Sequence, residues 1–165
     1  SKDFFAAEII NAALGHDTIS SRLAELRNKY GLTYGVDSSF SDVSEPYAAW
    51  QITLTVNPEN TSKSLKLLGG IVDKFYKDGL TAEELAVEKK RLSGEYIVNR
   101  LRTPGSIAGL ISRYAIIDVP MAFIDNHTAN LDRVTLSEAN AAIKRFMDLK
   151  TCTTSVAGTV PKLNP

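Results

Sequence analysis

The hydrophobic residues of this chain recur mainly every three or four positions, which is the period of an amphipathic α-helix. The first such stripe predicts a helix over residues 3–14 that ends at Gly15. The second half, up to about Phe146, is predicted to be helical, because each of its apolar stripes follows a signal that starts a helix. These signals are Asn57-Pro58, Thr81 with Glu84, Thr103-Pro104, Pro120 (a short helix through about Leu131) and Thr135 with Glu138.

Three segments are instead predicted to be β-strands. Residues 48–56 alternate cleanly, and a polar, turn-rich link over 37–46 joins them to a strand in which Tyr34 and Val36 are expected to share one face. Residues 151–157 are predicted to be a last strand that buries Cys152. Adjacent, antiparallel early strands among many helices predict one α+β domain over residues 1–165, with helices packed on one face of an antiparallel or mixed sheet.

A junction between a helix and a strand carries the candidate functional side chains. Apolar spacing over Ser20–Tyr30 predicts the helix, Gly31 supplies the left-handed residue that commonly ends one, and a strand follows. Arg27 lies on the last helical turn and Tyr34 just inside the strand, so the turn should bring them close together. Taken alone, the residues favour a plainer interpretation: a cation at the helix C-terminus and an ordinary strand aromatic.

Composition excludes several functional classes. The 19 basic and 19 acidic residues cancel and form no basic run, which leaves no electrostatic case for nucleic-acid binding. A single cysteine cannot form an internal disulfide, and no apolar run has the length of a membrane span. The chain begins inside an expected helix without a signal peptide, so we expect a soluble fragment whose compartment, cytoplasmic or periplasmic, stays open.

A zinc site built wholly from this chain is not expected, because catalytic zinc needs three protein ligands. The two histidines, His16 and His127, are far apart in sequence, and neither H-E-x-x-H nor H-x-x-E-H is present. We interpret His16 as a loop residue and His127 as a surface residue. Ser20 and Ser21 have no neighbouring base in the sequence that would make either a nucleophile.

The junction resembles the second, zinc-free domain of the pitrilysin/insulinase-type zinc metallopeptidases, which include the mitochondrial processing peptidases. The matching motif runs from Leu14-Gly15 through Ser20-Ser21-Arg22-Leu23 and Leu26-Arg27 to Gly31-Leu32-Thr33-Tyr34. The arginine and tyrosine of that family fall on Arg27 and Tyr34. His16 departs from the motif, since a second glycine is usual there. The general layout of the rest also fits, so the resemblance covers most of the chain.

The resemblance implies a LuxS/processing-peptidase-like half-domain that lacks its first strands, which would leave one sheet edge open. It implies that Arg27 and Tyr34 contact the substrate carbonyl and its oxyanion, and that Gly31, Leu32 and Thr33 bind the peptide. Zinc would be held by a homologous partner domain, on the same chain or on a separate subunit, and this chain alone would be inactive. The alternative is a non-catalytic structural or peptide-binding homologue of the same family.

Overall fold

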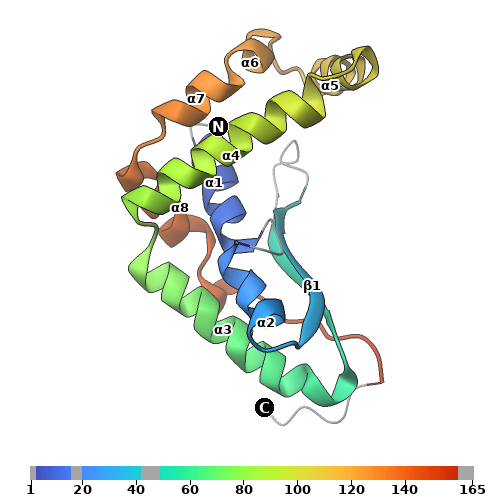
Figure 1. The fold of residues 1–165 in the computed structure, drawn as a ribbon, viewed down its shortest axis with the longest axis vertical. Coiled ribbons are helices and arrows are strands. Elements are labelled where there is room, and N and C mark those ends of the chain that lie inside the picture. Colours follow the sequence, from blue (N-terminus) through green and yellow to red (C-terminus); the bar gives the residue numbers. More distant parts are fainter. Residues whose placement is uncertain (1–2, 16–19, 42–48, 160–165) are drawn as a thin grey trace.

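The computed structural model describes residues 3–15, 20–41 and 49–159. Figure 1 shows α1 near the middle of the molecule, with β1 to its right, α8 to its left, α4 crossing its upper part and α3 running below it. The front half comprises α1 (Phe4–Gly15), a 3₁₀ turn η1 (Arg22–Ala24), α2 (Glu25–Asn28), β1 (Thr33–Phe40) and β2 (Trp50–Val56).

The back half is helical, as the sequence predicts. Its elements are η2 (Pro58–Asn60), α3 (Thr61–Asp78), α4 (Ala82–Arg100), α5 (Pro104–Ile116), α6 (Ala122–Asp125), α7 (His127–Arg133), α8 (Leu136–Phe146) and η3 (Leu149–Thr151). Within the described residues, β1 and β2 form one two-stranded antiparallel sheet. The α+β class is therefore confirmed, with a small sheet and a helical majority.

Three helices start with reciprocal capping hydrogen bonds, in which a threonine side chain and the third helical residue satisfy each other's backbone N–H groups. The predicted pairs Thr81–Glu84 and Thr135–Glu138 are confirmed. A third pair, Thr103 with Ser106, starts α5 in the same way. The sequence indicates this start by Thr103-Pro104 but not by a capping pair, because serine is not the usual partner in such a motif.

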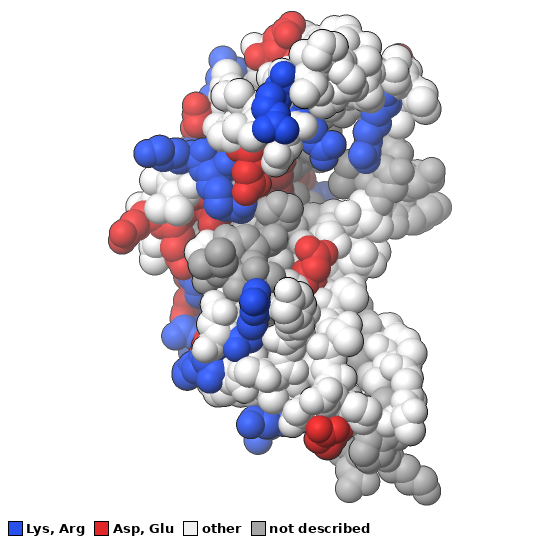
Figure 2. Space-filling view, turned by 45° about the vertical axis from the view of Figure 1, so that its right-hand side comes forward, with Lys and Arg blue, Asp and Glu red and all other residues white. Residues whose placement is uncertain are grey.

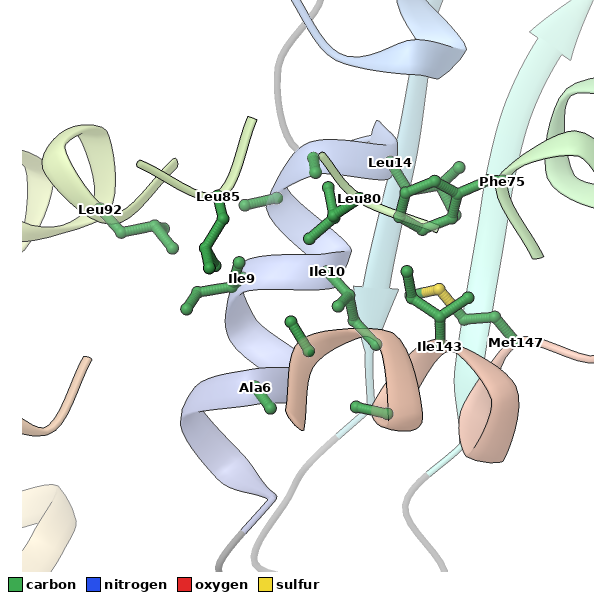
Figure 3. Close-up of a cluster of buried hydrophobic side chains, with 14 of the residues drawn as sticks. Ala6, Ile9, Ile10, Leu14, Phe75, Leu80, Leu85, Leu92, Ile143 and Met147 are labelled. Carbon is green, nitrogen blue, oxygen red and sulfur yellow. The ribbon is translucent and has the colours of Figure 1, made fainter. Parts of the chain in front are cut away.

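The core is built around α1. Ile9, Ile10 and Leu14 are fully buried, and α1 packs against α8, α4 and β1. In Figure 3, Leu14 lies beside Phe75 of α3, while Ile143 and Met147 approach from α8 and the residue after it. Helices thus cover one face of the sheet, where Val36 is buried and the side chains of β2 alternate between half-buried and exposed.

Two segments differ from the prediction. Residues 151–157 are not a strand: η3 ends at Thr151, the following residues are irregular and exposed, and Cys152 is exposed rather than buried. In the described part of the chain β1 pairs only with β2, so the segment 151–157 finds no ladder to join. Likewise, the helix expected from Pro120 to Leu131 is two helices, because the Asn126 side chain bonds the Ala122 carbonyl and ends α6.

A partly buried network of hydrogen bonds made by Arg22 holds η1 against the turn between α3 and α4. The Arg22 guanidinium donates to both carboxylate oxygens of Glu84, at 2.7 and 2.9 Å, and to the Gly79 carbonyl at 3.0 Å. Its Cζ atom also lies 4.9 Å from the centroid of the Phe75 ring. Because η1 leads directly into α2, this network anchors the segment that carries Arg27.

We expect Glu84→Gln to lower the free energy of unfolding by about 1 kcal/mol at pH 7. This value is the usual contribution of a charge-assisted hydrogen bond, reduced because the pair is partly exposed to solvent. Burial opposes ionisation of Glu84, but the Thr81 N–H and the Arg22 charge outweigh it and lower its pKa from 4.5. A lowered folded-state pKa stabilises the protein above the ordinary value, and this contribution is lost as the pH falls through the folded-state pKa. Urea unfolding at pH 7 and in strong acid measures the effect.

Glu83→Gln is the matched control, since Glu83 is exposed on the same first turn of α4. It should stay within about 0.5 kcal/mol of the unmodified protein. A stability difference between the Glu84 variant and the unmodified protein that persists or grows in acid would contradict the role given to the ion pair.

Candidate functional site

The candidate site begins with a short helical segment closed by glycine. Leu23 and Leu26 are fully buried and hold η1 and α2 against the core. Gly31 has a φ of 59°, in the left-handed region that glycine adopts without strain. Its N–H donates to the Arg27 carbonyl, and the Leu32 N–H donates to the Leu26 carbonyl, each at 3.0 Å. The last helical carbonyls are thereby satisfied, and the chain turns directly into β1.

A β-bulge at the start of β1 decides where Tyr34 points. Thr33 lies opposite Val56 and Val36 opposite Leu54, so three steps on β1 match two on β2. The extra residue reverses the alternation of side chains. The prediction that Tyr34 and Val36 share a face is therefore wrong: Tyr34 is 88% exposed, whereas Val36 is 4% exposed.

The structure brings Arg27 and Tyr34 together across the glycine turn. The Arg27 Cζ atom lies 5.0 Å from the centroid of the Tyr34 ring, which is a cation–π contact. Neither side chain makes a hydrogen bond or an ion pair with another described residue. A permanently charged guanidinium and a phenolic hydroxyl thus lie side by side.

Neighbouring charges on α2 are already engaged. Lys29 pairs with Glu25 at 2.7 Å, and this hydrogen bond raises the pKa of Lys29. The ammonium also lies 5.0 Å from the Tyr30 ring centroid. The nearest acidic side chain on the helix is therefore held by Lys29 and not by Arg27.

The three remaining residues of the predicted site lie in the same turn but face differently. Gly31 is exposed, whereas Leu32 and Thr33 are each only 7% exposed and turn their side chains into the protein. The Thr33 hydroxyl is occupied by backbone groups of both strands, namely Gly35 and Thr55. Of the five predicted site residues, Gly31 and Tyr34 are therefore exposed, and Arg27 is half-buried.

No group of three or more metal-ligating side chains lies together in the described ranges. His16 falls outside the described residues. The prediction that His127 is a surface residue is wrong, because α7 packs its ring flat on Tyr96, with ring centroids 3.8 Å apart, and leaves it 3% exposed. Its Nε2 atom lies 3.5 Å from a Glu8 oxygen. No signal in the sequence around His127 indicates this burial, which depends on aromatic residues distant along the chain.

Tyr96 illustrates how closed this interior cluster is. Burial, followed by the nearby acidic groups Tyr114, Asp125 and Glu8, raises the pKa of Tyr96 to about 12. The phenol therefore stays protonated and donates to the Ile124 carbonyl at 3.2 Å. This is a structural hydrogen bond that ties α4 to α6.

A cavity of about 730 Å³ lies between α1, β1 and α4 and was not anticipated from the sequence. Glu8, Asn11, Asp37 and Tyr96 are among its lining residues, but Arg27 and Tyr34 are not. The pair therefore lies outside this cavity. In the described part of the face drawn in Figure 2, basic and acidic side chains are interspersed, without a single-sign patch.

Comparisons with known proteins identify relatives among the zinc proteases and their homologues. The family model described as "Peptidase M16 inactive domain" matches residues 1–92. An uncharacterized zinc protease of Mycobacterium tuberculosis is 22% identical over 143 residues, which cover 87% of this chain and 32% of that protein. The "non-peptidase homolog YmxG" of Helicobacter pylori is 25% identical over 163 residues, covering 98% of this chain and 37% of that protein.

The fold also matches a solved structure. The peptidase M16 inactive domain from Pseudomonas fluorescens superposes with a TM-score of 0.79 at 25% identity, over 90% of this chain and 35% of that one. The chain spans about a third of the length of the relatives it matches. In the part of the chain that the structure describes, none of the helices is long and apolar enough to cross a membrane.

Proposed function

Because this chain belongs to the family of peptidase M16 inactive domains, we propose that it is the non-zinc half of a zinc metalloendopeptidase. In this role Arg27 and Tyr34 hold the substrate backbone opposite a zinc-bearing homologous domain, carried on the same chain or on a separate subunit. We expect the chain alone to be inactive, because its sequence contains neither H-E-x-x-H nor H-x-x-E-H.

The observation that carries the proposal is the geometry of the pair. A cation–π contact of 5.0 Å places the two side chains next to each other, and Tyr34 is almost fully exposed. Within the described ranges Arg27 has no carboxylate partner, so the contact with Tyr34 is the interaction that the structure shows for its guanidinium. A surface that presents free donors is suited to a ligand that supplies carbonyl oxygens.

Each residue has a definite task in this scheme. The forked guanidinium of Arg27 donates to backbone carbonyls of an extended peptide, and its charge favours the developing oxyanion. The Tyr34 hydroxyl donates to the scissile carbonyl, while the exposed Gly31 lets the peptide backbone approach. Leu32 and Thr33 form the floor beneath. Zinc in the partner domain would supply the activated water.

A second candidate function is a non-catalytic homologue that binds peptide or supports an assembly. The relative from Helicobacter pylori, which matches 98% of this chain, is described as a non-peptidase homolog. In that case the Arg27–Tyr34 surface would still contact a partner, but no reaction would depend on it.

Reconstitution distinguishes the two. We expect the purified chain to leave a quenched peptide library intact, and to support its cleavage once mixed with the zinc-bearing homologous domain from the same organism. The metal chelator 1,10-phenanthroline should abolish this cleavage, because only the partner carries the metal. Stable assembly of the two domains without cleavage of any library peptide would favour the non-catalytic homologue.

A further inference from the structure

The Thr33 side chain bonds backbone groups of both strands at the β-bulge that exposes Tyr34. In a regular ladder Tyr34 would lie opposite Val56, on the face where Val36 packs against the helices. The bulge places Thr33 there instead, so Thr33 and Val36 are both buried although they are three residues apart. The exposure of Tyr34 is therefore a consequence of the one-residue shift.

A bulge leaves backbone groups without ladder partners, and unpaired buried groups are costly. The Thr33 hydroxyl lies 2.7 Å from the Gly35 carbonyl and 2.8 Å from the Thr55 carbonyl, and accepts from the Gly35 N–H at 3.2 Å. It thus contacts both strands at the position of the shift. Among the side chains of the described residues, only that of Thr33 bonds these three backbone groups.

We infer that Thr33 is a positioning residue: its hydroxyl stabilises the bulge that turns Tyr34 out of the packed face of the sheet and over Arg27. The catalytic consequence rests on the proposed function, whereas the structural part does not. Any loss of the hydroxyl should allow β1 to slip toward a regular register, which would draw Tyr34 toward Val56 and away from the guanidinium.

The variants separate the hydroxyl from the shape of the side chain. Thr33→Val keeps the shape and removes the hydroxyl, and Thr33→Ser keeps the hydroxyl. Thr53→Val is the matched control, because Thr53 is an exposed threonine on β2 beyond the bulge. If Thr33→Val does not fold, Thr33→Ala removes the same hydroxyl with less bulk, and the same criteria apply.

Two measurements report the geometry without activity. The first is hydrogen exchange of the Gly35 amide, and the second is relaxation of 3-fluorotyrosine at position 34 by a soluble gadolinium chelate. We expect Thr33→Val to speed the exchange and to shield the fluorine from the chelate. Thr33→Ser and Thr53→Val should behave as the unmodified protein does. Equal exchange and equal relaxation in Thr33→Val and Thr53→Val would overturn the inference.

Activity of the assembled peptidase adds the functional readout. A misplaced donor should lower kcat roughly 10- to 100-fold in Thr33→Val, with recovery in Thr33→Ser. If the fluorine signal moves but turnover does not, the positioning role of Thr33 stands and the proposed oxyanion contact of Tyr34 fails. The two claims therefore fail in distinguishable ways.

Discussion

Replacing Tyr34 with phenylalanine is expected to lower kcat of the assembled peptidase by about 10²- to 10³-fold, the usual cost of removing one oxyanion donor. The substitution deletes only the hydroxyl. Because the ring is 88% exposed and keeps its contact with Arg27, the free energy of unfolding should change by less than about 0.5 kcal/mol. KM should change little, since the bond is strongest in the transition state.

Tyr30→Phe is the matched control, as this tyrosine lies four residues away and contacts Lys29 rather than Arg27. It should leave kcat unchanged. Arg27→Lys is a useful third variant, because lysine keeps the charge but loses the planar fork, and it should fall between the unmodified enzyme and Arg27→Ala. Undiminished turnover in both Tyr34→Phe and Arg27→Ala would remove the catalytic role while leaving the family assignment intact.

Local signals account for most of what was predictable here. The glycine stop at Gly31 and the caps at Thr81 and Thr135 each act over three or four residues, so the sequence displays them directly. The position of Arg27 next to Tyr34 follows from the same local turn. This is why the proximity of the pair could be predicted from the eight positions 27–34 without knowledge of the core, whereas the roles given to the two side chains came from the family resemblance.

Features that depend on distant partners could not be predicted in this way. The bulge is defined by the register between β1 and β2, and it reversed the expected face of Tyr34. His127 is buried by aromatic rings from α1 and α4, which no local pattern connects to it. Residues 151–157 are predicted to be a strand, yet a strand needs a neighbour, and the described residues provide none.

Phe75→Ala is expected to lower the free energy of unfolding by about 3–5 kcal/mol, because a fully buried ring leaves a cavity as well as losing its transfer energy. Phe75 lies beside Leu14 of α1 in Figure 3, and the Arg22 guanidinium stacks on its ring at 4.9 Å. Its loss therefore affects both the packing of α3 on α1 and the anchor of η1. Domains of this size are stable by only about 5–15 kcal/mol, so urea unfolding should show a large shift.

Ile116→Ala serves as the control, since Ile116 is 84% exposed and should cost less than about 0.5 kcal/mol. Phe75→Leu separates volume from aromaticity: it refills much of the cavity but removes the ring that Arg22 stacks on. If Phe75→Leu weakens the Arg22–Glu84 ion pair, the difference between pH 7 and acid stability should shrink along with it. A Phe75→Ala variant that loses less than about 1 kcal/mol would mean that α3 does not share the core of α1, and that the helix–strand junction is anchored elsewhere.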